Sequence, residues 1–412
     1  MTIPSATLVL AASDSGSGSD GRTSISAQTP LLGIPLVRRA VLSANRAGFE
    51  RVFVVGGAAA ANGVLDGTGA RPFPREGADS ALPPGRIVLL PDRVAATPEW
   101  MRGARSAALE PGHLYPLGPG AIVDAEDPAP LSRALARASG LAAIEADWAA
   151  ALPAGVTAAL APPVEVRTEA DLADAERQLL RGLVKKEDGI LTRLVSRKIS
   201  LAVTRRLART AVTPNAMTLV CLALGLAAAA CFASPAWPRQ VAGGLLFLLH
   251  SILDGCDGEL ARLKFSESRL GGVLDFVADN VVHVAVFSAF AVAWSTEVGR
   301  PWPFALGALA VAGTIAGAGF VYAYAMRPRP SAGPVLTTVS PAHRSRLSEI
   351  LDAVARRDFI YLVMVLALFG KGYWFLAAAA VGTPAFFASL LILALAAKRK
   401  ERRGPGSVSV AQ

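Results

Sequence analysis

Hydrophobic positions follow two different patterns along the chain, and the change falls near residue 166. Before it, short apolar runs bounded by polar or glycine-rich stretches flank a helical repeat at 35–48. Such short runs are typical of buried strands. They lie at 7–12, 51–55, 86–90 and 121–123. Because strands alternate with helical segments, the pattern predicts an α/β layer fold over residues 1–165.

Residues 166–210 combine helical spacing with positive charge. The stretch 169–183 has the spacing of an amphipathic helix, and 185–209 contains eight Lys and Arg residues. A basic amphipathic segment beside long apolar stretches is typical of helices that lie along an anionic bilayer surface. We therefore expect juxtamembrane amphipathic helices in this segment.

From residue 211 onward the pattern is that of membrane-spanning helices. A helix needs about 20 apolar residues to cross roughly 30 Å of hydrocarbon. Six segments approach that length, at about 216–233, 241–263, 271–294, 304–324, 356–370 and 373–397. The expectation is an all-α six-helix transmembrane domain over 211–400, followed by a cytosolic tail at 401–412.

Composition and charge support a multi-pass membrane protein. The chain is 52% hydrophobic and 18% charged, with a mean hydropathy of +0.43. The stretches that flank and connect the six segments carry 23 Lys and Arg on one side and 3 on the other. This asymmetry predicts a cytoplasmic (inner) membrane protein with both termini in the cytoplasm. The net charge of +9 arises in the apolar half, so it favours membrane lipids or phosphorylated ligands as partners rather than nucleic acid.

Four aspartates gather at the cytoplasmic ends of the second and third predicted spans. Asp254 and Asp257 share one helix face with Ala261, and Asp275 and Asp279 share one face of the next helix with Gly271. Close carboxylates in a low dielectric repel one another unless cations neutralise them. Hard oxygen ligands select Mg²⁺, Mn²⁺ or Ca²⁺, and four carboxylates indicate two ions.

Neighbouring residues suggest how a phosphorylated substrate could bind. Gly258 and Gly271 leave room for close approach to the backbone, and Arg262 is placed to bind phosphate. Two other interpretations are open: the aspartates could pair only with Arg262, Lys264 and Arg269, or they could mark an ion pathway. His250 and His283, one turn outside the cluster, are expected to pack between helices, with orientation of a metal ligand as the alternative.

The spacing of this cluster resembles the signature of the CDP-alcohol phosphotransferase (CDP-alcohol phosphatidyltransferase) family. The matching pattern is Asp254-x2-Asp257-Gly258-x2-Ala261-Arg262-x8-Gly271-x3-Asp275-x3-Asp279. Pro214-Asn215-x2-Thr218, at the start of the first span, also resembles the family's entry motif. The resemblance covers about residues 185–400. It implies a six-helix membrane enzyme, usually a homodimer.

The resemblance also implies roles for these residues. All four aspartates would bind two Mg²⁺ or Mn²⁺ ions, and Asp279 would also be the catalytic base that takes the acceptor's hydroxyl proton. Asn215, Thr218 and Gly271 belong to the same substrate site, in which Gly258, Ala261 and Arg262 would shape the pocket for cytidine and diphosphate. The donor would be of the CDP-diacylglycerol or CDP-inositol type, and the acceptor an alcohol, possibly itself phosphorylated. The product would belong to phospholipid biosynthesis or related polar-head chemistry, with release of CMP.

Residues 6–57 resemble a sugar-phosphate nucleotidyltransferase. The resemblance lies in LVLAASDSGSGSDGR and in the segment that begins TPLLGIP. Arg22 can stand in for the family's loop arginine, whereas the family's lysine is replaced by Gln28-Thr29. The family's metal-binding aspartate is expected near 114–123, where Gly118-Pro119-Gly120 stands and Asp124 is a poor substitute. We therefore expect the fold to be kept and nucleotidyl transfer to be lost.

The order of the two modules resembles bifunctional cytidylyltransferase/phosphotransferase proteins of inositol metabolism, which make di-myo-inositol phosphate phosphate. The likeness includes the element Lys185-Lys186-Glu187-Asp188-Gly189. An active front domain that makes its own CDP-alcohol from CTP is therefore the alternative function. A divalent-cation transporter is a more distant one.

Overall fold

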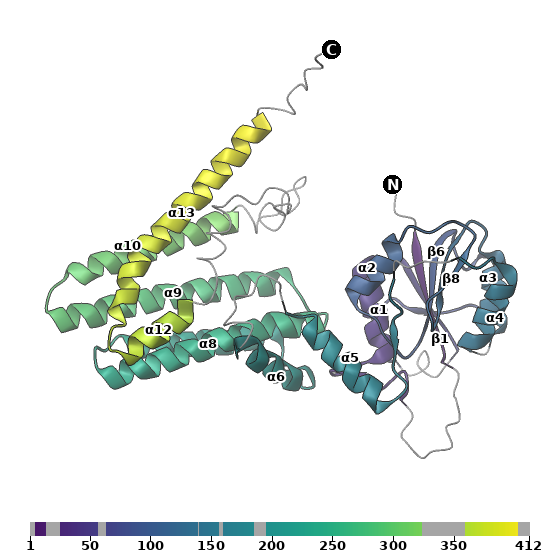
Figure 1. Cartoon of the computed structure of the whole chain (residues 1–412), viewed down its shortest axis with the longest axis horizontal. Coiled ribbons are helices and arrows are strands. Elements are labelled where there is room, and N and C mark those ends of the chain that lie inside the picture. Colours follow the sequence, from purple (N-terminus) through teal and green to yellow (C-terminus); the bar gives the residue numbers. More distant parts are fainter. Residues whose placement is uncertain are drawn as a thin grey trace, which may run out of the picture. The chain divides into compact units, whose positions relative to one another are not determined.

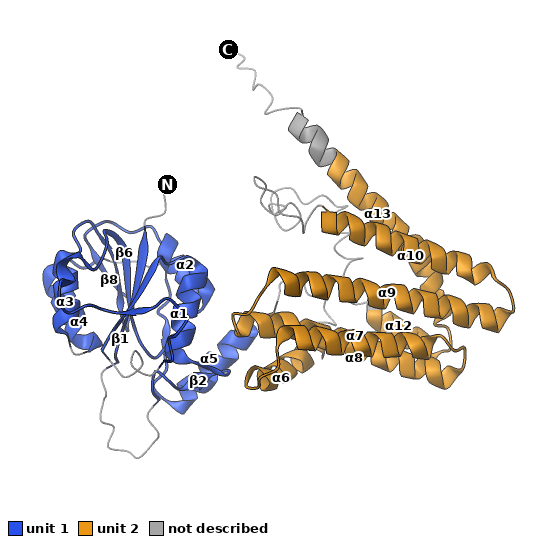
Figure 2. Cartoon of the chain, turned by 180° about the vertical axis from the view of Figure 1, so that it is seen from behind, with its two compact units in different colours: residues 1–183 blue, residues 184–412 orange. Residues whose placement is uncertain are grey.

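The computed structural model describes residues 5–13, 25–56, 63–138, 140–155, 160–184, 195–323 and 359–402. The chain divides into two compact units, residues 1–183 and 184–412 (Figure 2). The division falls inside the expected juxtamembrane segment 166–210. Its first helix, α5 (Glu169–Arg181), therefore belongs to unit 1, and α6 (Arg197–Ala208) belongs to unit 2.

Unit 1 is built on a six-stranded mixed sheet in the order β5-β4-β1-β6-β9-β8. The strands are β1 (Ala6–Ala11), β4 (Arg51–Val55), β5 (Arg71–Pro72), β6 (Gly85–Pro91), β8 (Leu114–Pro116) and β9 (Ala121–Ala125). β1 pairs in parallel with β4 and β6, and β9 runs antiparallel to β6. All four strands predicted from the apolar runs are present, and the α/β class is confirmed.

Helices cover both faces of this sheet (Figure 1). They are α1 (Leu36–Ala47), α2 (Pro98–Ser106), α3 (Ala129–Arg137) and α4 (Leu141–Ala151), with the short 3-10 helix η2 (Ala78–Ser80). Successive strand residues point to opposite faces. Leu8 and Leu10 consequently pack with α1 and α2, whereas Val9 packs with α3 and α4.

The remaining elements of unit 1 are small and lie around α5. They are the pairs β2 (Pro30–Leu31) with β3 (Ile34–Pro35) and β7 (Val94–Ala95) with β10 (Val164–Glu165). α5 begins with a capping box in which Thr168 and Asp171 satisfy each other's backbone N–H groups. Its buried Ala175 packs with Leu31 and Leu36, which explains why α5 belongs to this unit.

Unit 2 is helical throughout its described residues. Besides α6 it contains α7 (Pro214–Phe232), α8 (Trp237–Leu263), α9 (Arg269–Val298), α10 (Trp302–Val321), α12 (Phe359–Leu368) and α13 (Tyr373–Arg402). Five helices of the described chain are long and apolar enough to cross a membrane, namely α7, α8, α9, α10 and α13. The chain is thus a multi-pass membrane protein by the length and composition of its helices.

The expected count of six spans is not confirmed. The span predicted at 356–370 starts among residues outside the described part of the chain. Its described portion is α12, whose 10 residues fall short of the roughly 20 needed to cross a bilayer. The basic residues expected at 327–357 also lie outside the described residues.

Helix α7 packs against both α8 and α9. A Cβ atom at Gly225 of α7 would lie 2.5 Å from a methyl group of Val282 on α9, so the absence of a side chain allows this close approach. Phe232, Phe247 and Phe290 form the centre of the unit's core, with Phe232 stacked on Phe290 at 4.4 Å between ring centres. This packing determines where α8 and α9 present their polar ends.

Candidate active site and metal centre

The turn between α8 and α9 brings the aspartate-bearing helix ends together. α8 ends at Leu263, and Phe265 adopts a left-handed conformation with φ 53° that reverses the chain. Ser268 then caps α9, because its hydroxyl accepts a hydrogen bond from the N–H of Gly271. Because the connection is short, residues near its two ends are neighbours in space.

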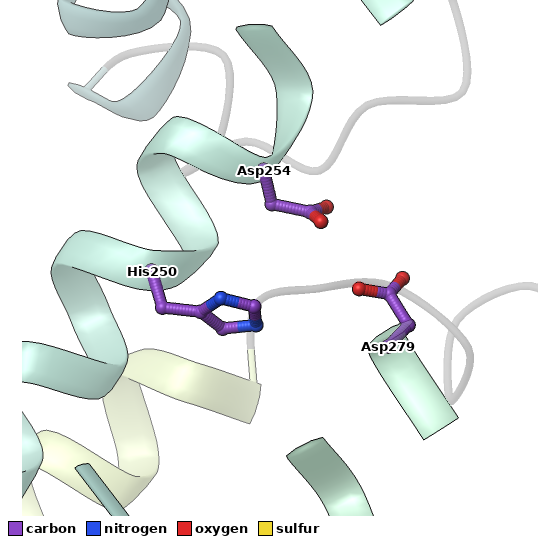
Figure 3. Close-up of side chains that lie close together, drawn as sticks. All are labelled: His250, Asp254 and Asp279. Carbon is purple, nitrogen blue, oxygen red and sulfur yellow. The ribbon is translucent and has the colours of Figure 1, made fainter. Parts of the chain in front are cut away.

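Asp254, Asp279 and His250 form a compact cluster. One potential metal-ligand atom from each residue lies within 4.8 Å of the other two. His250 and Asp254 project from α8 and Asp279 from α9, and their side chains point toward one another (Figure 3). Asp254 and His250 are buried, with 8% and 6% of their surfaces exposed. The structure thus unites two of the four predicted aspartates and adds a histidine that the sequence favoured as a packing residue.

Asp257 and Asp275 line an adjoining cavity of about 150 Å³ that is open to solvent. The cavity is formed by the start of α7, the end of α8 and the start of α9. All six residues predicted to bind the nucleotide donor are also in its lining, namely Asn215, Thr218, Gly258, Ala261, Arg262 and Gly271. The four aspartates are therefore arranged as two pairs, one in the histidine cluster and one in the wall of the cavity.

Asp257 is held by two hydrogen bonds. Thr218 Oγ1 donates to Asp257 Oδ2 at 2.5 Å, and the backbone N–H of Gly258 donates to Oδ1 at 2.5 Å. Thr218 lies on α7 and is itself buried. Donors of this kind determine the orientation of the carboxylate. Thr218 thereby acts on a predicted metal ligand as well as lining the cavity.

The two glycines of the motif stand where side chains come close. A Cβ atom at Gly271 would lie 3.0 Å from Asn215 Oδ1, and one at Gly258 would lie 3.4 Å from Arg262 Nη1. Asn215 therefore lies against the first turn of α9, and the guanidinium of Arg262 lies beside Gly258. A cation so close to the cavity can bind a diphosphate, and the bare glycine backbone leaves space for it.

Lys264 binds the backbone between α6 and α7. Its Nζ donates to the carbonyl oxygens of Thr210 and Val212 at 2.6 and 2.8 Å. These contacts hold the end of α8 against the segment that leads into α7. In the purely structural interpretation Lys264 pairs with the aspartates, whereas its Nζ is bound to these two carbonyl oxygens.

A buried ion pair behind the cavity was missed from the sequence. Glu259 is fully buried on the face of α8 opposite the aspartates, and its carboxylate accepts from Arg197 Nη1 at 2.6 Å. Ser200 and Thr204 of α6 donate to the same carboxylate at 3.0 and 2.7 Å. The group joins α6 to α8. The sequence contains one signal for this pair. Glu259 lies about 140° around the helix from Asp254, so a buried carboxylate there needs a partner from another element.

Unit 1 contains a carboxylate that the sequence did not single out. Asp92 follows β6, beside the end of β1, and its Oδ1 accepts hydrogen bonds from the N–H and the hydroxyl of Ser13. Burial raises the pKa of Asp92, partly offset by these two hydrogen bonds. Asp124, considered as a substitute metal ligand, instead forms a two-point ion pair with buried Arg86. The glycine-rich loop of the nucleotidyltransferase resemblance, with Gly16, Gly18, Gly21 and Arg22, lies outside the described residues. So does the element at 185–189.

Comparison with known proteins agrees with the motif. Residues 211–383 match the sequence model of the CDP-alcohol phosphatidyltransferase family. The membrane unit contains a CDP-alcohol phosphatidyltransferase domain. This CDP-alcohol phosphatidyltransferase domain includes every residue of the aspartate cluster, the cavity wall and the start of α7.

Curated relatives match over a limited segment. The chain is 38% identical over 122 residues to a protein of Archaeoglobus fulgidus described as a bifunctional IPC transferase and DIPP synthase, which covers 29% of this chain and 24% of that protein. A protein of Thermococcus kodakarensis with the same description is 37% identical over 134 residues, covering 32% and 30%. The match thus spans about a quarter to a third of these relatives' length.

Solved structures with a loose backbone likeness include the phosphatidylinositol phosphate synthase of Mycobacterium tuberculosis. With CDP-DAG bound, that protein is 23% identical, has a TM-score of 0.33, and the match covers 47% of this chain and 93% of that chain. In complex with manganese and citrate it is 24% identical with a TM-score of 0.32, covering 46% and 88%.

Proposed function

We propose that this protein is an integral-membrane CDP-alcohol phosphotransferase. It transfers a substituted phosphate, either phosphatidyl or phospho-alcohol, from a CDP-linked donor to an acceptor alcohol and releases CMP. The observation that carries the proposal is the meeting of Asp254 and Asp279 beside a cavity lined by Asp257, Asp275 and Arg262, all within the family domain. The donor is of the CDP-diacylglycerol or CDP-inositol type, and the acceptor is an alcohol that can carry a phosphate.

The four aspartates are proposed to hold two Mg²⁺ or Mn²⁺ ions. Their donor chemistry suits such ions, because carboxylate oxygens are the ligands that hard divalent cations prefer. Convergence of buried carboxylates is also costly unless positive charge lies between them. When bound, the ions neutralise the diphosphate and stabilise the CMP leaving group.

The remaining steps belong to the chain's own residues. Arg262 binds the diphosphate, and Gly258 and Gly271 let the nucleotide approach the backbone. Asp279 takes the proton of the acceptor hydroxyl, whose oxygen attacks the β-phosphorus. A new P–O bond forms as the bond from that phosphorus to the CMP oxygen breaks. The proton is left on Asp279, and CMP departs with the electron pair.

The topology and assembly belong to the same proposal. The asymmetry of 23 against 3 positive residues supports both termini in the cytoplasm of an inner-membrane protein. The active site would then face the compartment that contains soluble nucleotides. A homodimer is proposed from the family resemblance.

A panel of CDP donors and alcohol acceptors, with CMP release as the readout, tests this function. Purified protein should release CMP with at least one pair, and Asp279→Asn should abolish release while the protein elutes from size exclusion as before. Glu297→Gln is the matched control, because Glu297 is an exposed acid at the other end of α9. Undiminished CMP release by Asp279→Asn would remove this residue as the base. Metal uptake into liposomes without CMP release would indicate the transporter instead.

For unit 1 we infer a nucleotidyltransferase-like fold that no longer transfers nucleotides. Gln28-Thr29 replaces the expected lysine, and Asp124 is engaged by Arg86. One observation favours the bifunctional alternative: Asp92 lies at the carboxyl ends of parallel strands, where α/β sheets bind ligands.

Pyrophosphate release separates these two possibilities for unit 1. The full chain carrying Asp279→Asn, incubated with CTP, Mg²⁺ and alcohol phosphates, should release no pyrophosphate. Release that disappears in Asp92→Asn would establish the bifunctional enzyme.

A further inference from the structure

His250 has the environment of a metal ligand. It lies one turn before Asp254 on α8, is 94% buried and stacks on Phe247 with 5.9 Å between ring centres. Its ring points toward Asp254 and Asp279 (Figure 3). The family signature quoted above contains no histidine, so the function proposed for the aspartates leaves this side chain without a role.

A backbone carbonyl determines which ring nitrogen can bind a cation. His250 Nδ1 lies 2.9 Å from the carbonyl oxygen of Cys221 on α7. Because a carbonyl oxygen only accepts hydrogen bonds, Nδ1 carries a proton, and in the neutral ring Nε2 carries the lone pair. Histidines that bind metals almost always donate their other N–H to a carbonyl or carboxylate in this way. The contact to Cys221 is independent of the acidic cluster.

The electrostatics of the cluster point to a cation between the three side chains. A nitrogen lone pair and two carboxylates within 4.8 Å bring like charge density together, with His250 and Asp254 buried and Asp279 half-buried. A divalent ion bound by all three relieves that repulsion. Imidazole nitrogen is a ligand for Mn²⁺, Fe²⁺, Co²⁺ and Zn²⁺, whereas Mg²⁺ is held mainly by oxygen.

We propose that His250 Nε2 is a nitrogen ligand of the cation held by Asp254 and Asp279, and that it makes this site prefer transition-metal ions such as Mn²⁺ over Mg²⁺. The inference rests on the metal site of the proposed function and adds a ligand and a selectivity to it. The second cation, if held by Asp257 and Asp275 at the cavity, has oxygen ligands.

Pulsed EPR of bound Mn²⁺ detects this nitrogen directly. The full-length protein with Mn²⁺ should show hyperfine coupling to a directly coordinated nitrogen, and ¹⁵N-histidine labelling should change it to the ¹⁵N pattern. The coupling should vanish in His250→Gln and persist in His283→Gln. His283 is the matched control because it lies one turn after Asp279 but outside the cluster.

Metal affinity gives a second readout. In His250→Gln the Kd for Mn²⁺ should rise roughly tenfold or more, while that for Mg²⁺ should change by less than about threefold. Mn²⁺ bound by oxygen ligands alone in the wild type would overturn the proposal. An equal loss of affinity for Mn²⁺ and for Mg²⁺ in His250→Gln would overturn it too. If His250→Gln fails to fold, ¹⁵N labelling of the wild type and of His283→Gln still decides it.

Failure of this inference is distinguishable from failure of the proposed function. CMP release together with Mn²⁺ bound by oxygen ligands alone would remove His250 as a ligand and leave the enzyme. Nitrogen-bound Mn²⁺ with no CMP release from any donor would support His250 as a ligand and contradict the proposed enzymatic function.

Discussion

At the scale of single residues, hydrogen-bond donors orient the carboxylates of the candidate site. The orientation of the Asp257 carboxylate is fixed, because Thr218 and the N–H of Gly258 each donate a hydrogen bond to one of its oxygens. The motif identified Thr218 only as part of the donor pocket. Its contact with Asp257 depends on the packing of α7 against α8, which spacing along the sequence does not express.

Thr218→Val tests this contact, since it keeps the shape of the side chain and removes its O–H. Without the donor, Asp257 is less well oriented, and we expect CMP release to fall about 10- to 100-fold. The measurement is kcat/KM for the best donor of the panel. Thr314→Val is the control, because Thr314 Oγ1 donates only to its own helix at Ala310. A change below twofold in Thr218→Val would contradict the role.

The pH dependence of unit 1 depends on another single residue, Asp92. Burial raises its pKa above the ordinary value of about 4. Folding therefore favours the protonated form, so the free energy of unfolding is highest below that ordinary pKa and declines as the pH rises through the raised one. Asp92→Asn keeps the Oδ1 acceptor for Ser13 and removes the charge.

Residues 1–183 carrying Asp92→Asn should accordingly be more stable than the wild-type fragment at pH 7 and equally stable at the acid end of this window. Urea unfolding at a series of pH values measures the difference. An unfolding free energy of the variant that is lower than the wild type at pH 7 would contradict the sign.

Elements are joined at the site by groups that the motif does not contain. Glu259 binds α6 through Arg197, Ser200 and Thr204, and it does so on the face of α8 away from the aspartates. The amphipathic spacing of α6 predicted a helix on the bilayer surface. Its attachment to α8 is a property of the packing.

Glu259→Gln is expected to destabilise unit 2 by about 2 kcal/mol, because it removes the charge that pairs with the partly buried Arg197. Thermal unfolding of the detergent-solubilised protein measures this loss. Glu99→Gln breaks an exposed pair with Arg102 and should change stability by less than about 0.5 kcal/mol. Equal melting temperatures for the wild type and Glu259→Gln would show that the pair contributes no net stability.

The whole molecule consists of two units with separate cores. Among the residues that the structure describes, the apolar clusters of the α/β unit contain only residues before 184, and those of the membrane unit only residues after it. Every residue assigned to the aspartate cluster and the cavity belongs to the second unit. We therefore expect the proposed transfer to proceed without the first unit.

Residues 184–412 expressed alone should consequently release CMP at a rate within about threefold of the full chain, since their core is complete. The comparison uses the donor and acceptor identified by the panel. A fragment that is monodisperse and binds Mn²⁺ but releases no CMP would show that unit 1 takes part in turnover.

The sequence by itself determined the α/β class of the first unit, the helical membrane character of the second, and the stretch in which the acidic chemistry lies. These follow from local patterns: strand periodicity, the length of apolar segments and carboxylates at helical spacing. The span predicted at 356–370 stays unconfirmed, because its described part is a helix of ten residues and its start lies outside the described residues.

Tertiary structure alone decided which side chains meet across helices. His250 joins Asp254 and Asp279, Thr218 holds Asp257, Glu259 holds α6, and Asp92 lies at the carboxyl ends of β1 and β6. Apart from His250 with Asp254, which are both on α8, these contacts join segments that are distant in the sequence. Such pairs depend on how the elements pack and in which register. A single sequence does not contain the distances between its helices and strands.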